Sequence, residues 1–373
     1  MSGRDDSRRA DGRPLTVAVT GLNATDNPGP GVPVIRAIRA ACPDCRIVGL
    51  AYDALDPGNY MDGIADDVWL MPYPSQGAGV LEERLRAIHA TTPLDAVIPT
   101  LDSELPTYLK LVDRLRDLGI GTFLPTADML RLRGKDRLDA LRTELGVSTP
   151  RGVALTDPAA IGKLDEELDF PVMVKGQFYD AAIAYSPMDV HAHFERFRAK
   201  WGVPVIVQEF VAGEEYDVVA LGDGEGGLVG SVAMRKMQLT DKGKAWGGVT
   251  VADRKLDAFV RDTMAKLRWR GPCELEVMKA SDGSGLYLIE INPRFPAWVY
   301  LSVGAGRNLP WAAVQLALGE HVAPMPPAPA GVMFLRHSFD QICSLADYSA
   351  LTTLGELHHA AASSPATAEE VAR

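Results

Sequence analysis

Two neighbouring acidic motifs contain the side chains best suited to chemistry. Glu290 and Asn292 follow the apolar residues 286–289, and Glu274 and Glu276 lie in the apolar run 273–279. Side chains along a strand alternate between its two faces, so Glu290 and Asn292 point the same way, as do Glu274 and Glu276. Two adjacent strands would therefore present Glu276, Glu290 and Asn292 together. These oxygen ligands suit magnesium, which prefers carboxylates together with phosphate oxygens.

Arg294 follows directly and could neutralise charge on a transferring phosphoryl group. The alternative is that the acids are ordinary solvated strand residues. However, the stretch 272–291 is otherwise rich in apolar residues. A carboxylate on such a strand costs free energy unless it is paired or coordinates a metal. We therefore favour a metal site.

The first third of the chain predicts an α/β fold. Apolar strands alternate with helical patterns, which indicates a parallel sheet covered by helices. The expected strands are 15–21, 46–51, 67–70, 94–99 and 121–124, and the expected helices are 32–41, 80–91 and 103–118. Gly21, Gly29 and Gly31 lack GxGxxG spacing, so nicotinamide binding, with Asp53 as the ribose acid, is a weak alternative.

After Asp128 the pattern predicts an α+β region. A helix over 127–145 ends at Gly146, and strands are expected at 170–175, 204–210, 215–221, 228–234, 273–279 and 286–291. The turns at 223–227 and 281–285 imply hairpins, and therefore antiparallel pairing.

Composition excludes several classes of protein. The 373 residues carry a formal net charge of −11 and no long Lys/Arg run, which argues against a nucleic-acid partner. We find neither an apolar run long enough for a membrane helix nor a secretory signal, so the cytoplasm is the expected compartment. Cys42 and Cys45 have CxxC spacing without a second ligand pair. We expect a reduced pair in a turn, with a redox or metal role as the weaker alternative.

Together these motifs resemble the ATP-grasp ligases over about residues 16–320, particularly the carbamoyl phosphate synthetase-like and carboxylate–amine ligase branches. The resemblance implies a Rossmann-like pre-ATP-grasp domain followed by a two-subdomain ATP-grasp fold, a combination of α/β and α+β. The boundaries expected from it are a disordered lead-in (1–13), the first domain (14–126), a subdomain with two lysines (127–212), a subdomain with the metal site (213–322), and a Pro-rich linker with a small terminal element (323–373).

The resemblance also implies roles for particular residues. Lys135 and Lys175 match the two phosphate-contacting residues. Glu209, with backbone groups of Phe210 and Val211, would meet the adenine, and Glu215 the ribose hydroxyls.

The remaining matches concern the metal and the reacting groups. Glu276, Glu290 and Asn292 match the magnesium ligands, and Arg294 matches the arginine near the γ-phosphate. Met234 lies where the family places adenine-pocket residues, and Arg235 and Lys236 lie where it places a basic substrate contact. We thus expect Arg294, Lys175 and Arg235 to act in catalysis, although Arg235 and Lys236 could equally be solvated edge residues.

Several loops depart from the family pattern or remain open. The segment 176–182 has a single glycine where the family has a flexible, glycine-rich loop, and the lysine-bearing segment 240–248 could compensate. Loops 23–27 and 99–105 could line the substrate side of the cleft. Within the latter, we expect Ser103 to cap a helix.

The resulting functional prediction is an ATP-dependent carboxylate–amine ligase that forms an acyl phosphate and releases ADP. Its cofactors would be ATP and Mg²⁺ (or Mn²⁺), and its substrates a small carboxylate and an amine, such as an amino acid or short peptide. A homodimer is compatible with the resemblance. The alternatives are a bicarbonate- or carbamate-phosphorylating, carboxylase-like enzyme of the same fold, and a non-catalytic nucleotide-binding module.

Overall fold

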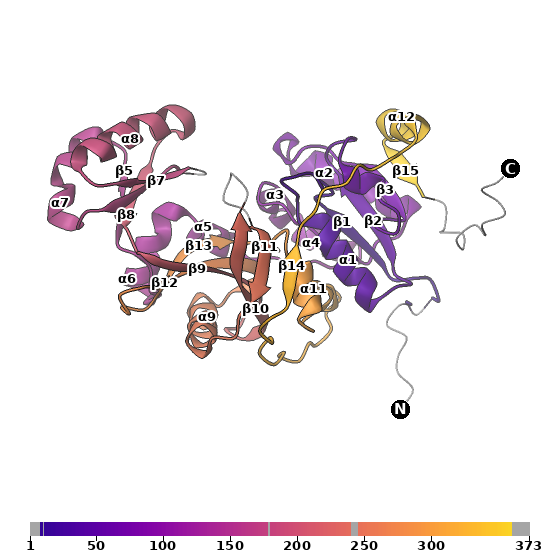
Figure 1. The fold of residues 1–373 in the computed structure, drawn as a ribbon. Coiled ribbons are helices and arrows are strands. Elements are labelled where there is room, and N and C mark those ends of the chain that lie inside the picture. Colours follow the sequence, from indigo (N-terminus) through magenta and orange to yellow (C-terminus); the bar gives the residue numbers. More distant parts are fainter. Residues whose placement is uncertain (1–7, 10, 178–179, 240–244, 360–373) are drawn as a thin grey trace.

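The computed structural model describes residues 8–9, 11–177, 180–239 and 245–359. Its strands form three β-sheets of five, four and six strands. Figure 1 shows the five-stranded sheet at one end of the molecule, the four-stranded sheet at the other, and the six-stranded sheet between them. The mixed α/β prediction is confirmed. The predicted domain boundaries remain predictions.

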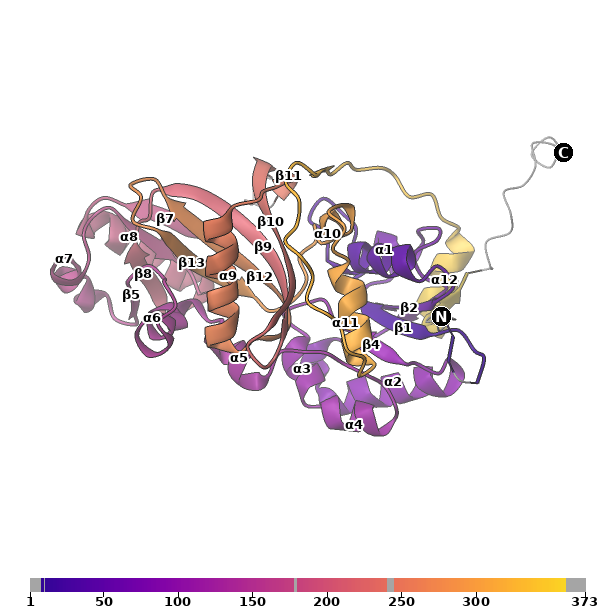
Figure 2. The same ribbon diagram turned by 90° about the horizontal axis from the view of Figure 1, so that it is seen from below.

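The five-stranded sheet has the order β15-β3-β2-β1-β4. Its four parallel strands are β1 (Thr16–Thr20), β2 (Arg46–Ala51), β3 (Asp67–Leu70) and β4 (Ala96–Ile98). Side chains of α1 (Gly31–Ala41) and α11 (Leu309–Ala317) pack on one face of the sheet. The other face is covered by α2 (Ala78–Thr91), α3 (Leu105–Leu109) and α4 (Val112–Asp117). Figure 2 shows these two layers on opposite sides.

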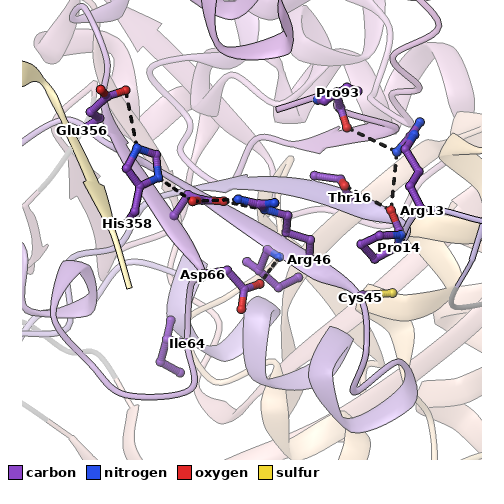
Figure 3. A network of polar contacts seen from close by, with 12 residues as sticks. Arg13, Pro14, Thr16, Cys45, Arg46, Ile64, Asp66, Pro93, Glu356 and His358 are labelled. Atoms are coloured by element: carbon purple, nitrogen blue, oxygen red, sulfur yellow. Dashed lines mark hydrogen bonds and ion pairs between the residues drawn. The ribbon is translucent and has the colours of Figure 1, made fainter. Parts of the chain in front are cut away.

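The fifth strand, β15 (Glu356–His358), comes from the end of the described chain and pairs antiparallel with β3. Asp67 of β3 anchors it, because its buried carboxylate contacts Nδ1 of His358 at 2.6 Å and Nε of Arg46 at 2.7 Å. Figure 3 shows His358, Glu356 and Arg46 in this network of polar contacts. Burial raises the pKa of Asp67, but Arg46 and His358 lower it more, so the net pKa lies below the ordinary value. The ionised carboxylate therefore helps to hold β15 in place.

The four-stranded antiparallel sheet has the order β5-β8-β6-β7. Its strands are β5 (Gly152–Leu155), β6 (Val172–Lys175), β7 (Ala181–Ala184) and β8 (Val205–Glu209). α7 (Leu164–Glu167) and α8 (Pro187–Trp201) pack on it through Leu164, Phe194 and Phe197.

The six-stranded antiparallel sheet has the order β13-β12-β9-β10-β11-β14. Its strands are β9 (Gly213–Asp223), β10 (Leu228–Leu239), β11 (Ala245–Thr250), β12 (Arg270–Ala280), β13 (Leu286–Asn292) and β14 (Met333–Leu335). One face is covered by α9 (Arg254–Leu267), whose apolar side chains join Val218, Leu275 and Val277 in one core. Residues of alternate parity, such as Val219 and Val232, face the other way.

Two predicted helices are each broken. The helix predicted over 127–145 is α5 (Ala127–Leu132), a 3₁₀ turn (Lys135–Arg137) and α6 (Leu138–Leu145), because Gly134 adopts an extended conformation with ψ 136°. The helix predicted over 103–118 is α3 and α4. Ser103 does not cap it: Glu104 holds the N-cap position, without a side-chain capping bond.

Three further expectations need correction. Cys42 and Cys45 form a disulfide at the end of α1 instead of a reduced pair. The strand predicted at 121–124 is only a single bridge between Gly121 and Ala96. The segment after the Pro-rich linker is not one separate element, because β14 joins the six-stranded sheet and α12 (Leu345–Leu354) leads into β15.

None of the helices in the described ranges has the length and apolar character needed to cross a bilayer. The expected lead-in lies partly outside those ranges, and residues 360–373 lie wholly outside them.

Candidate active site

Three carboxylates stand side by side across the six-stranded sheet. Asp217 of β9 is the register partner of Glu276 of β12, and Glu276 is the partner of Glu290 of β13. Directly opposed residues of adjacent strands point to the same face, and like charges placed opposite one another repel. The sheet therefore concentrates negative charge on the face away from α9.

The crowding of these carboxylates contributes to the pKa of Glu276. Burial first, and the charge of Glu290 second, raise the pKa of Glu276 to about 8. Asp217 has a raised pKa because of its burial and because of Glu274. Carboxylates held in this way need a cationic partner to stay ionised together.

The residues fit a magnesium ion. Asn292 lies beside Glu276, with its Nδ2 3.4 Å from Oε1, and its side-chain oxygen is a type of ligand that suits magnesium. Within the part of the chain that the structure describes, no three His, Cys, Asp or Glu residues cluster at metal-binding distance. Magnesium does not require such a cluster, because it takes one or two carboxylates and fills its shell with phosphate oxygens and waters.

Two lysines from different elements approach these acids. Lys135, in the 3₁₀ turn before α6, places Nζ 3.4 Å from Oε2 of Glu290. Lys175 ends β6, and its pKa is lowered by burial first and by the charge of Lys135 second. Two neighbouring ammonium groups repel one another, so an anion bound between them would be stabilised. The structure thus places Lys135 in contact with Glu290, and Lys175 near enough for the charges of Lys135, Glu290 and Glu276 to act on it. Their roles at a phosphate site remain predictions.

Lys236 is the basic residue of β10 that reaches this face. It forms an ion pair with Glu215, the predicted ribose ligand, and its Nζ lies 3.1 Å from Oδ1 of Asp217. Arg235 is the residue before Lys236 and therefore points to the opposite face of the strand. There its half-exposed side chain places Nη1 3.8 Å from Oε1 of Glu214. The structure does not bring Arg235 to the other predicted site residues.

Two of the residues predicted to contact adenine, Glu209 and Met234, already have partners or are buried within the protein. Both carboxylate oxygens of Glu209 accept hydrogen bonds from Arg151, from its backbone nitrogen at 2.9 Å and from Nε at 2.8 Å. Phe210 and Val211 form the link between β8 and β9. Met234 is fully buried in the core on the Asp217 face of the sheet. Any adenine contact at Glu209 would therefore use backbone groups.

Arg294 lies at the centre of a network that joins two parts of the fold. Its Nε donates to Asp102 at 3.1 Å, and its Nη1 donates to Glu274 at 2.8 Å. Asp102 also accepts from Arg133 at 2.9 Å, and Glu274 accepts from Nε1 of Trp298 at 2.7 Å. Burial lowers the pKa of Arg294, but Glu274 and Asp102 raise it above its ordinary value.

The loop that carries Asp102 follows β4, and the side chain of Glu104 holds its backbone in place. Glu104 is fully buried and accepts hydrogen bonds from the backbone nitrogens of Thr100 at 2.7 Å and Leu101 at 2.8 Å. Through the contact of Asp102 with Arg294, the loop 99–105 borders the site.

Sequence reasoning missed Arg133, Trp298 and the pairing of Glu274, because each depends on contacts between distant segments. Residues 178–179 and 240–244 of the two unusual loops lie outside the described residues.

The chain is similar to known proteins in sequence and in fold. Residues 202–337 match the family model "ATP-grasp in the biosynthetic pathway with Ter operon". The carbamoyl phosphate synthase large chain of Clostridium beijerinckii is 25% identical over 253 residues, which are 64% of this chain. This chain spans only 23% of that relative's length.

Solved structures show the same fold. The L-amino acid ligase from Bacillus licheniformis superposes with a TM-score of 0.59 and 16% identity, over 82% of this chain and 74% of that one. Biotin carboxylase from Campylobacter jejuni gives a TM-score of 0.64 at 16% identity, over 82% and 71% of the two chains. Residues 202–337 are thus similar to an ATP-grasp family, and the solved structures extend a likeness in fold to 82% of the chain.

Proposed function

We propose that the protein is an ATP-dependent carboxylate–amine ligase that activates an acid as an acyl phosphate and releases ADP. The observation that carries the proposal is the convergence of Lys135 and Lys175 on the carboxylate pair Glu276 and Glu290. Paired cations beside a divalent-metal site are what phosphoryl transfer requires of a protein, since catalysis there is mainly positioning and charge neutralisation.

The proposed chemistry assigns a task to each group. Glu276, Glu290 and Asn292 would hold Mg²⁺ (or Mn²⁺), which would neutralise phosphate charge when bound. Lys135 and Lys175 bind the phosphates of ATP, and Arg294 stabilises the charge that develops during transfer. The acid's carboxylate oxygen attacks the γ-phosphorus, and the bond to the β-phosphate oxygen breaks to release ADP. An amine then attacks the acyl carbon, loses a proton and expels phosphate, leaving an amide.

Binding of the nucleotide would have to widen a cavity of about 10 Å³ beside these groups. A small cavity between the turn at Lys135 and strands β5 and β8 is lined by Lys135, Val153, Ile206 and Gln208, among others. We infer that the adenine lies in this region, next to the backbone of Phe210 and Val211, and that Glu215 contacts the ribose through a rearranged pair with Lys236. The substrates would be small molecules from the cytoplasm, such as an amino acid or a short peptide.

One experiment tests the reaction class. The protein is incubated with Mg-ATP, hydroxylamine and pooled amino acids and small carboxylic acids, and ADP is resolved from AMP. We expect acid-dependent ADP together with a hydroxamate. Release of AMP would mean adenylation and would refute the acyl-phosphate mechanism.

The second candidate is phosphorylation of bicarbonate or carbamate. Its support is the carbamoyl phosphate synthase relative, which matches 64% of this chain. A parallel incubation with bicarbonate and no other acid separates the two candidates, because only this second reaction would release ADP under those conditions.

A further inference from the structure

The side chain of Asp102 is bound in the way that a small carboxylate ligand would be bound. Its Oδ1 accepts from Nη1 of Arg133 at 2.9 Å, and its Oδ2 accepts from Nε of Arg294 at 3.1 Å. Each oxygen thus meets a different guanidinium group, and guanidinium groups are well suited to bind carboxylates. Asp102 comes from the loop after β4, whereas both arginines belong to the segment that follows residue 126.

Arg294 does not need Asp102 to keep its position. On its other edge, Nη1 donates to Glu274 at 2.8 Å, and Glu274 is in turn held by Nε1 of Trp298 at 2.7 Å. Glu274 and Trp298 are both buried. Two carboxylates therefore bind one guanidinium, and only one of them is locked by the core.

Asp102 is the carboxylate that can leave. Its side chain is 35% exposed, whereas that of Glu274 is 9% exposed. The backbone below it stays fixed, because Glu104 binds the nitrogens of Thr100 and Leu101. A rotation of the Asp102 side chain into solvent would thus open the space between the two arginines without moving the loop.

The opened space would border the proposed phosphate site. Arg294 lies two residues after Asn292, and Arg133 lies two residues before Lys135, whose Nζ is 3.4 Å from Glu290. A carboxylate bound between Arg133 and Arg294 would therefore lie next to the groups that hold the metal and the phosphates.

We propose that Arg133 and Arg294 form the binding site for the carboxylate to be phosphorylated, and that Asp102 fills this site until the acid displaces it. The proposal rests on the proposed ligase function. It adds Arg133 as a substrate-binding residue and Asp102 as a residue that sets the affinity for the acid. If Asp102 occupies the site for about nine-tenths of the time, the apparent affinity for the acid is lowered about tenfold.

The first test needs no turnover. Thermal unfolding of the Asp102→Ala variant is followed while sodium acetate replaces sodium chloride at constant ionic strength. The matched control is Asp113→Ala, which removes an exposed acid paired with Arg116 at 2.8 Å elsewhere on the surface. We expect acetate to stabilise Asp102→Ala saturably, and to stabilise the control and the unaltered protein only at about tenfold higher acetate concentration. Equal responses of all three proteins would overturn the proposal.

The second test is kinetic. The KM for the acid should fall about tenfold in Asp102→Ala and also in Asp102→Asn, which keeps the shape of the side chain but loses its charge. A KM that is unchanged or higher would mean that Asp102 only positions the arginines, and would overturn displacement even if acetate binds. If the unaltered protein releases no ADP with any acid, the ligase function fails instead, and the acetate titration alone then decides whether the two-arginine site exists.

Discussion

Replacement of Glu290 by glutamine should separate activity from stability. Glu290 is directly opposed to Glu276 on the neighbouring strand and helps to raise the pKa of that residue to about 8. The amide keeps the size of the side chain but removes a charged ligand from the proposed magnesium site. Loss of one preorganised charged contact typically costs on the order of 100- to 1,000-fold in kcat, and we expect a loss of that size.

The stability of the variant should change little. Glu290→Gln loses the contact with Lys135 at 3.4 Å, which at this partial exposure is worth at most about 1 kcal/mol. It also removes the repulsion with Glu276, which has the opposite sign. The midpoint of thermal unfolding without ligands should therefore move by no more than about 2–4 °C, in either direction.

The assay combines acid-dependent ADP release over a range of magnesium concentrations with thermal unfolding of the free protein. Glu195→Gln is the matched control, because Glu195 forms an exposed ion pair with Arg198 on α8, away from the acids. Full activity of Glu290→Gln in a folded protein would refute the metal assignment. A large loss of stability would instead show that Glu290 is needed mainly for the fold.

Three further predictions concern other charged residues. Lys175→Met should raise the KM for ATP about tenfold or more, because a charge-assisted phosphate contact is lost; an unchanged KM would exclude Lys175 from the phosphate site. Arg235→Ala should leave kcat/KM within about twofold, since the exposed Arg235 faces away from the acids, and a large loss would mean that our placement of the site is incomplete. Asp67→Asn should destabilise the protein at pH 7 in urea unfolding. The pKa of Asp67 is lowered from 3.8 in the folded state, so its contribution should be constant above about pH 5 and shrink as the pH falls below about 4; a difference that is unchanged at pH 3 would contradict this.

The sequence predicted those features that depend on local periodicity. The hairpin turns at 223–227 and 281–285 identified antiparallel strands, and alternation along β12 and β13 correctly placed Glu276 and Glu290 on one face. Prediction from the sequence failed where tertiary contacts or single residues override the periodic pattern. Gly134 divides a region of good helical periodicity, and β15 is a three-residue strand whose position depends on a buried aspartate far away in the sequence.

Alternation also explains the part of the site that was predicted least well. Met234, Arg235 and Lys236 are consecutive, and one strand cannot send neighbouring side chains to the same face. Met234 and Lys236 share the face of Asp217, so Lys236 is the basic residue that reaches the acids and Arg235 is not. The motif match assigned Met234 to the adenine pocket and Arg235 and Lys236 to a basic substrate contact, whereas strand geometry brings only Lys236 of the two basic residues to the face of the acids.

The network around Arg294 could not be derived from any local pattern, because Arg294 and Asp102 are 192 residues apart. It nevertheless decides how the parts of the fold cooperate. Asp102 belongs to the loop after a strand of the five-stranded sheet, and Arg294 follows a strand of the six-stranded sheet. An acid that displaces Asp102 would therefore exchange an internal contact between these parts for a contact with itself. Its binding energy would be reduced by the energy of the contact that it replaces, so the chain can set its affinity for the acid at a residue that takes no part in phosphoryl transfer.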